Sequence, residues 1–135
     1  MSGVHVRVRV CQERYALPIE NILEVANQGA LTTVPGARAA VLGVRNLKGH
    51  VLPVFDVARV LTVPGDPSTD RVLVAEHDGR LAGLAVEEVT DVGPLATGGA
   101  ETESEYLTGA VLEDGRLVGI IDVGRLFRSL AALAS

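Results

Sequence analysis

Three histidines and two aspartates are the residues of this sequence best suited to chemistry. His5, His50 and His77 could bind a metal, but their spacing fits no common ligand pattern and each lies at an expected strand or loop edge. Asp56 and Asp122 could form an acid–base pair of carboxylates. Each of them stands where an apolar strand gives way to a helical pattern, so we interpret both as helix caps. We expect the histidines on the solvated surface.

The remaining candidates for catalysis are isolated residues. The loop Gly93–Gly99 lacks the Lys-Ser/Thr ending that contacts phosphate. Ser104 and Tyr106 have no histidine close by in the sequence to activate them. Cys11 is the single cysteine, so an internal disulfide is excluded, and its place in a strand pattern indicates packing. We therefore predict no enzymatic activity, no metal and no cofactor; a small hydrolase that uses the two aspartates is the weakest alternative.

The stretch Gly43–Leu61 is the element around which the chain is organised. It reads as a polar turn, an apolar strand, an aspartate and a helical turn. Moved by 66 residues it aligns with Gly109–Phe127, where Gly meets Gly and Asp meets Asp, and a shift of 67 aligns Leu17–Val25 with Leu84–Val92. We infer two related halves, about 1–65 and 70–135. The alternative is that valine-rich strands align this well by chance.

The composition indicates a β protein with an aliphatic core. The chain has 135 residues, of which 47% are apolar and 3% aromatic, and the abundance of valine favours strands. The formal charge of −5 argues against a nucleic-acid partner, which usually meets a basic face. No apolar run is long enough to cross a membrane, and the N-terminus lacks the pattern of a signal peptide. We expect a cytoplasmic protein with no direct membrane insertion.

Alternation and turn signals predict an all-β fold. Val4–Val10 alternates valine with His and Arg, which predicts a strand with one buried and one wet, cationic face. Asp78-Gly79 and Asp114-Gly115 are hairpin signals. We count roughly nine or ten strands in small barrels, an exposed loop over Gly93–Ser104, and an amphipathic C-terminal helix after Asp122.

Several longer motifs of this chain resemble CheW-type chemotaxis coupling proteins. Arg14–Val25 fits the segment Y-x-L/I-x-x-x-x-V-x-E-I of that family, and Gly43–Val57, G-V-R-N-L-K-G-H-V-L-P-V-F-D-V, fits G-V-x-N-L-R-G-x-V-x-P-V-x-D-L. Arg71–Val92 and Glu105–Val123 fit its second half. The resemblance spans about residues 4–128 and implies one CheW-like domain over 1–135. Its fold would be two SH3-like five-stranded β-barrels, partly intertwined by exchanged strands, with short helices.

The resemblance also implies a function. Such proteins are adaptors without catalysis or cofactor that join the cytoplasmic tip of methyl-accepting chemotaxis receptors to a CheA-type histidine kinase, in arrays beneath the inner membrane where self-association is possible. The alternative is a divergent CheW-like interaction or inhibitory module of another pathway, which binds one partner or itself without bridging. Lys48 stands where the family usually has arginine, so a bidentate fork becomes a point charge.

The motifs assign a set of residues to partner contacts. The family's N-L-R-G and x-E-I positions lie in regions used for receptor and kinase contacts, and further apolar positions lie near a groove between the barrels, where a receptor helical hairpin would bind. Transferred by motif to this chain, these positions are Asn46, Leu47, Lys48, Gly49, Glu24, Ile22, Val86 and Val89.

Overall fold

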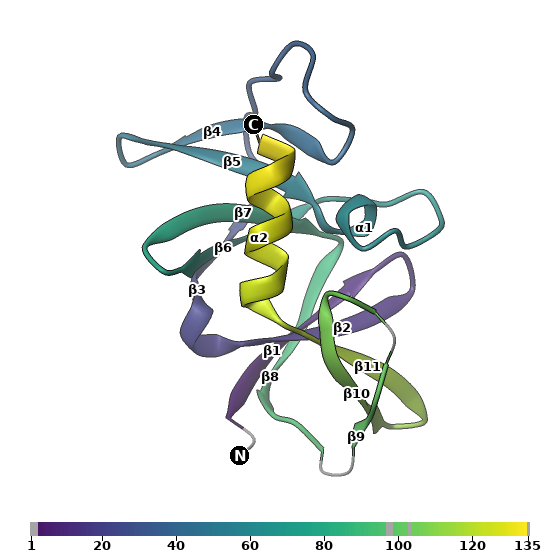
Figure 1. Ribbon diagram of the computed structural model, residues 1–135. Helices are drawn as coiled ribbons and strands as arrows, with labels where there is room; N and C mark the ends of the chain where they lie inside the picture. The colour runs from purple at the N-terminus through teal and green to yellow at the C-terminus, as the bar shows by residue number, and fades with distance from the viewer. Residues whose placement is uncertain (1–2, 97–98, 103, 135) are drawn as a thin grey trace.

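Strands account for most of the structure. The computed structural model describes residues 3–96, 99–102 and 104–134, and in these residues eleven strands form two sheets (Figure 1). The expected all-β class is therefore confirmed. In the described residues three helices accompany the sheets: two short ones, η1 (Ile19–Asn21) and α1 (Val57–Val60), and the longer C-terminal helix α2 (Val123–Ala134).

The two sheets have the same strand order once the internal repeat is considered. The five-stranded sheet runs, from edge to edge, β3 (Ile22–Asn27), β6 (Arg71–His77), β7 (Arg80–Val86), β5 (His50–Asp56) and β4 (Val41–Leu47). The six-stranded sheet runs β8 (Glu88–Pro94), β1 (Val4–Val10), β2 (Glu13–Pro18), β11 (Arg116–Ile121), β10 (Leu107–Glu113) and the short β9 (Gly99–Ala100). Each sheet thus takes two adjacent strands from the other half of the chain, which intertwines the halves.

The one parallel pairing in each sheet joins the halves in matching register. In the five-stranded sheet Val54 of β5 is opposite Gly83 of β7. In the six-stranded sheet Ile120 of β11 is opposite Ala16 of β2. Ile120 follows Val54 by 66 positions and Gly83 follows Ala16 by 67, the offsets seen in the sequence. The repeat is therefore present in the pairing of the backbone as well as in residue types.

Tight turns join the antiparallel strands. Lys48-Gly49, Asp78-Gly79 and Asp114-Gly115 all have positive φ at both residues, as a two-residue type I′ hairpin requires. The two Asp-Gly signals therefore mark hairpins, as the sequence predicts. The turn after β1 uses Cys11-Gln12, both with positive φ, and not the expected Gln12-Glu13.

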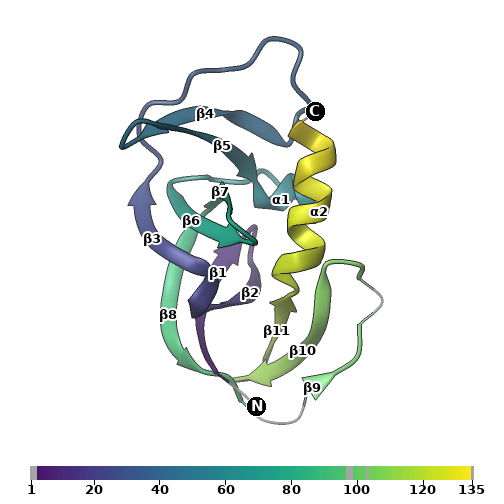
Figure 2. The same cartoon turned by 60° about the vertical axis from the view of Figure 1, so that its left-hand side comes forward.

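The main core lies between the two sheets and beneath α2. Figure 2 shows α2 running alongside both sheets, from the end of β11 toward β4 and β5. Leu126 is fully buried and Phe127 is 5% exposed, so the helix presents its apolar face to the core, as the sequence predicts. No helix of the described residues is long and apolar enough to span a membrane. Buried members of the core include Val6, Val8, Val10, Leu17, Phe55, Val57, Leu73, Leu84, Val86, Ile121, Leu126, Phe127 and Leu130.

The prediction that one face of β1 is exposed to solvent is wrong at the centre of the strand. The Arg7 side chain is only 13% exposed and donates to both oxygens of Glu113, from Nε at 2.7 Å and from Nη2 at 2.8 Å. Glu113 also accepts the backbone N–H of Ala96 at 3.0 Å. His5 is 8% exposed and its Nδ1 lies 2.8 Å from Gly3 O, so it is not the solvated histidine that we expect from the sequence. The sheet curls over this face, and the alternation of residue types alone cannot reveal that.

The Gly93–Ser104 segment is also less open than predicted. Leu95 packs against a second small core of Ala16, Val111 and Val118. Gly99–Ala100 pairs with β10. Thr97, Gly98 and Glu103 of the expected loop lie outside the described residues.

Candidate protein-interaction site

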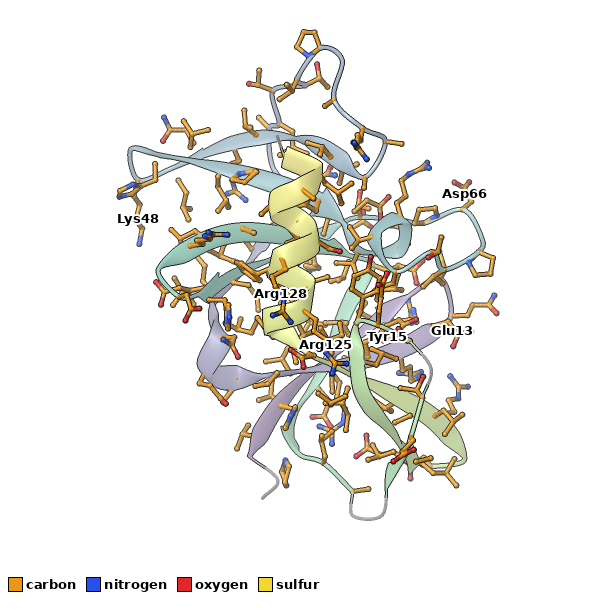
Figure 3. The ribbon with its side chains drawn as sticks, in the orientation of Figure 1. Glu13, Tyr15, Lys48, Asp66, Arg125 and Arg128 are labelled. Atoms are coloured by element: carbon orange, nitrogen blue, oxygen red, sulfur yellow. The ribbon has the colours of Figure 1, made fainter. Side chains whose placement is uncertain are left out.

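The β4–β5 turn carries the motif residues Asn46–Gly49 at its tip. Asn46 Oδ1 accepts the backbone N–H of Gly49 at 3.0 Å, which closes the turn from within. Leu47 is half-buried, whereas Lys48 is exposed and forms no ion pair with any described residue. Figure 3 shows Lys48 pointing outward at the end of this hairpin. The ammonium group is therefore available to a partner on a turn that its own side chain does not stabilise.

The hairpin behind this tip is held at its base. A Cβ on Gly43 would lie 2.6 Å from the carbonyl oxygen of Thr32, so only glycine allows this close approach. The N–H of Thr32 donates to Val44 O at 2.9 Å, and Val44 N–H donates back at the same distance. Arg45 Nη1 donates to Asn27 O, at the end of β3, at 2.8 Å. The Arg45 bond links β4 to the end of β3, the opposite edge of the same sheet, and thus helps to close a barrel. The Thr32–Val44 bonds hold the connection between these two strands against β4.

Strand β3 forms an edge with apolar side chains in solvent. Glu24 is half-buried opposite Val74 of β6, and Ile22 packs against the main core. Leu23 and Val25 alternate with them and are 56% and 47% exposed. Exposed large apolar side chains on a free strand edge are typical of a contact surface. The sequence analysis does not assign Leu23 and Val25 to partner contacts. The signal for them is their position on either side of Glu24 in a strand, where neighbouring side chains point to opposite faces.

The two valines assigned to the groove differ in accessibility. Val89, on β8, is half-buried at the margin of the main core. Val86, at the end of β7, is 1% exposed and belongs to the core itself. Val86 therefore lies beneath the surface and is not accessible to a partner in this conformation. Both valines adjoin the link between the sheets, because β7 leads directly into β8.

The β4–β5 tip and β3 lie on the same side of the molecule in both ribbon views (Figures 1 and 2). We call the set Ile22, Leu23, Glu24, Val25, Asn46, Leu47, Lys48 and Gly49 the coupling face. It offers apolar side chains together with one carboxylate and one ammonium group. Such a mixture provides affinity through apolar burial and orientation through charge.

The two aspartates lie at equivalent helix starts. Asp56 Oδ1 accepts the N–H of Ala58 at 3.1 Å, and Asp122 Oδ1 accepts the N–H of Arg125 at 3.1 Å. In each case an arginine three residues on also approaches the second carboxylate oxygen, Arg59 at 3.4 Å and Arg125 at 3.5 Å. Both carboxylates are thus used in helix-capping contacts.

The perturbed groups have structural causes. The hydrogen bond from Arg7 lowers the pKa of Glu113, and the same bond raises the pKa of Arg7. Burial raises the pKa of the Cys11 thiol and of the Tyr15 phenol, so both stay protonated near neutral pH. Among the described residues no cluster of three or more His, Cys, Asp and Glu side chains has a geometry that could hold a metal ion.

Two intertwined β-barrels with a presented turn and an apolar strand edge have the features expected of a protein-interaction domain. The family model described as "CheW-like domain" matches residues 5–131. The chain therefore belongs to the CheW-like domain family.

Individual relatives agree with this assignment. The chain is 28% identical over 132 residues to a probable chemotaxis protein CheW of Rhizobium etli, which covers 90% of this chain and 85% of the relative. It is 30% identical to Protein FrzA of Myxococcus xanthus, over 90% of this chain and 82% of the relative. The crystal structure of the scaffolding protein TtCheW from Thermoanaerobacter tengcongensis superposes with a TM-score of 0.84 at 24% identity, over 94% of this chain and 88% of that one. This last likeness supports the SH3-like fold.

Proposed function

We propose that this protein is a cytoplasmic adaptor that couples methyl-accepting chemotaxis receptors to a CheA-type histidine kinase. Membership of the CheW-like family carries the proposal, because several relatives are named chemotaxis proteins CheW. In this proposal the protein works in receptor arrays beneath the inner membrane, where copies of it can also meet.

The coupling face supports the proposal by its accessibility. Lys48 is exposed on a turn closed by Asn46, so its charge can be changed without loss of a structural bond. Leu23 and Val25 supply apolar area beside the half-buried Glu24. A receptor helical hairpin could place an apolar stripe along this edge, with its charges against Lys48 and Glu24.

A ternary pull-down with a receptor tip fragment and a CheA-type kinase tests the proposal. We expect the wild-type protein to retain both partners at once. Lys48→Glu and Glu24→Lys should each weaken at least one contact by about tenfold, which corresponds to about 1.4 kcal/mol, with an unchanged thermal melt. Arg38→Glu, at another exposed position, is the matched control for charge reversal.

The possible results distinguish an error in the assigned contact residues from an error in the proposed function. Binding of each partner alone but never of both would favour the alternative, a module that occupies one partner without bridging. Normal ternary binding by both charge-reversed variants would contradict the assigned coupling face while leaving the adaptor role in place. Failure to bind either partner would overturn the proposed function.

A further inference from the structure

The imidazole of His5 on β1 has one ring nitrogen without a partner. Its Nδ1 lies 2.8 Å from Gly3 O, and because a carbonyl oxygen only accepts, Nδ1 carries the hydrogen. In the neutral ring Nε2 is therefore a hydrogen-bond acceptor. Nε2 forms no hydrogen bond with a described residue, and it is not fully enclosed, because Arg14 Nε is the one fully buried side-chain nitrogen or oxygen of the described residues that lacks a partner.

His5 lines a hollow of about 630 Å³ that extends from β1 to η1, β11 and the first turn of α2. His5 is only 8% exposed, so the accessible part of its ring lies at this hollow. Ligand pockets in proteins usually have volumes of about 300–1,000 Å³ and mostly apolar walls with a few polar groups. The larger apolar side chains around the hollow are those of Pro18, Leu95, Val111, Ile120, Ile121 and Val123.

The ionisable groups around the hollow are few and already have partners. Asp122 is the one carboxylate of the described lining residues; it caps α2, and its second oxygen lies 3.5 Å from Arg125 Nε. The Nε2 atom of His77 lies 3.5 Å from Asp78 Oδ2. Such surroundings favour a neutral ligand over an ion, because an ion would lose its hydration without a free counter-charge. The uncharged polar side chains also form bonds within the protein, from Asn21 Nδ2 to Glu76 O and from Thr108 Oγ1 to Ile120 O.

The internal repeat indicates that the fold does not require an imidazole at this position. At the offset of 67 residues His5 corresponds to Val72 on β6. The strand pairing agrees with this, because His5 is opposite Pro18. Val72 is opposite Ala85, which follows Pro18 by the same 67 positions. Val72 is fully buried and packs with Val54 and Ala85. The five-stranded sheet thus fills the position with an aliphatic side chain, whereas the six-stranded sheet has an unpaired acceptor beside a hollow.

We propose that this hollow binds a neutral aromatic ring that carries one hydrogen-bond donor, a phenol or an indole. The O–H or N–H of the ligand donates to His5 Nε2, and the ring lies against Leu95, Val111 and Ile120. Phenol and indole combine a large apolar body with a single polar hydrogen, which matches apolar walls with one unpaired acceptor. Such a ring belongs either to a free small molecule or to a Tyr or Trp side chain of a partner protein, and the test distinguishes the two sources.

The test uses the full chain and two matched pairs of compounds. p-Cresol and indole carry the donor, and in p-methylanisole and N-methylindole a methyl group replaces its hydrogen. Each compound is titrated against the protein in mildly alkaline buffer, where imidazole is neutral. Binding is followed by the NMR signal of His5 Nε2 and by NOE contacts from the ring to the methyl groups of Leu95, Val111 and Ile120. We expect millimolar binding of p-cresol and indole, and about fivefold to tenfold weaker binding of the methylated compounds, as for the loss of one hydrogen bond.

Substitution of His5 tests the acceptor directly. His5→Val introduces the residue that the other half of the chain has at the equivalent position, so we expect it to fold. It should lower the affinity for p-cresol to that for p-methylanisole. His50→Val, at an exposed position of β5, should bind all four compounds like the wild type. If His5→Val does not fold, the comparison of the four compounds on the wild-type protein still decides the proposal.

The pentapeptides Gly-Gly-Tyr-Gly-Gly and Gly-Gly-Trp-Gly-Gly distinguish the two sources of the ring. Peptide binding with the same NOE contacts would support the hollow as a site for a partner's side chain. Binding of p-cresol and indole without binding of the peptides would support a free small molecule as the ligand. The absence of NOE contacts to the three apolar side chains, or equal affinity for p-cresol and p-methylanisole, would overturn the proposal.

Discussion

The bond between Arg7 and Glu113 joins two strands that lie near opposite edges of the six-stranded sheet. Arg7 comes from β1 and Glu113 from the end of β10, and Arg7 Nη2 also donates to Pro94 O at 2.6 Å. One side chain thus connects β1, β8 and β10. Because Arg7 also lowers the pKa of Glu113, the ionised form of the carboxyl is tied to the folded state.

Glu113→Gln should make stability less dependent on acid pH. The folded pKa of Glu113 lies below its unfolded value, about 4.3, so its stabilising effect is complete above that value and is lost as the pH falls through the folded pKa. At pH 7 we expect the substitution to cost about 1–3 kcal/mol, less near pH 3. Urea melts across this pH range measure the difference, with Glu105→Gln, an exposed acid, as control. A constant difference at all pH values would contradict the assignment.

The burial and contacts of individual side chains were harder to predict from the sequence than the strands and helices. Arg7 and His5 occupy polar positions of an alternating strand, and the sequence places such positions in solvent. The groups that cover Arg7 come from strands far along the chain, with Gly93 86 residues and Glu113 106 residues further on. The burial of Val86 could not be predicted either, because the sequence of an apolar motif position is the same whether the residue lines a groove or belongs to the core.

At the scale of elements, local patterns predicted most of the structure. The Asp-Gly turns, the alternation in β1 and the apolar spacing of α2 are each contained in a few neighbouring residues, so they could be recognised directly. The short pairing of Gly99–Ala100 with β10 could not, because its sequence has only loop signals. The proposed coupling face combines both kinds of signal: its turn is a sequence motif, whereas the exposure of Leu23 and Val25 depends on β3 being an edge strand.

Gly43 should be indispensable to the β4–β5 hairpin. Gly43→Ala would place a methyl group 2.6 Å from Thr32 O, and backbone must move to relieve it. We expect a loss of about 1–3 kcal/mol, the usual range for overpacking, in thermal or urea unfolding. Gly3→Ala is the control, because nothing lies within 4 Å of a Cβ there. An unchanged melt for Gly43→Ala would show that the base of this hairpin is not rigid.

Asp122 should act on α2 through capping alone. Asp122→Ala removes the acceptor of the Arg125 N–H and should cost about 1 kcal/mol, whereas Asn caps about as well as Asp, so Asp122→Asn should cost much less. Chemical denaturation of the two variants measures this order. Equal losses in both would mean that the negative charge, through Arg125, matters more than the hydrogen bond.

At the scale of the whole molecule, the exchange of strands makes each half dependent on the other. β1 and β2 pair with β8 and β11 from the second half, and β6 and β7 join β3 to β5 in the five-stranded sheet. Without β6 and β7, β3 has no strand partner in its own half. The sequence repeat alone indicates two related halves, and the strand pairing shows that each half contributes strands to both sheets.

Fragments 1–65 and 70–135 should therefore fold only together. Alone, the first fragment keeps the hairpins β1–β2 and β4–β5, and isolated two-stranded hairpins are marginally stable in water. Mixed, the fragments can rebuild both sheets and the common core, whose members come from both halves. Circular dichroism and NMR dispersion of each fragment and of their equimolar mixture measure this, with the intact chain as reference. A cooperative melt by either fragment alone would mean that its hairpins can close a core without exchanged strands.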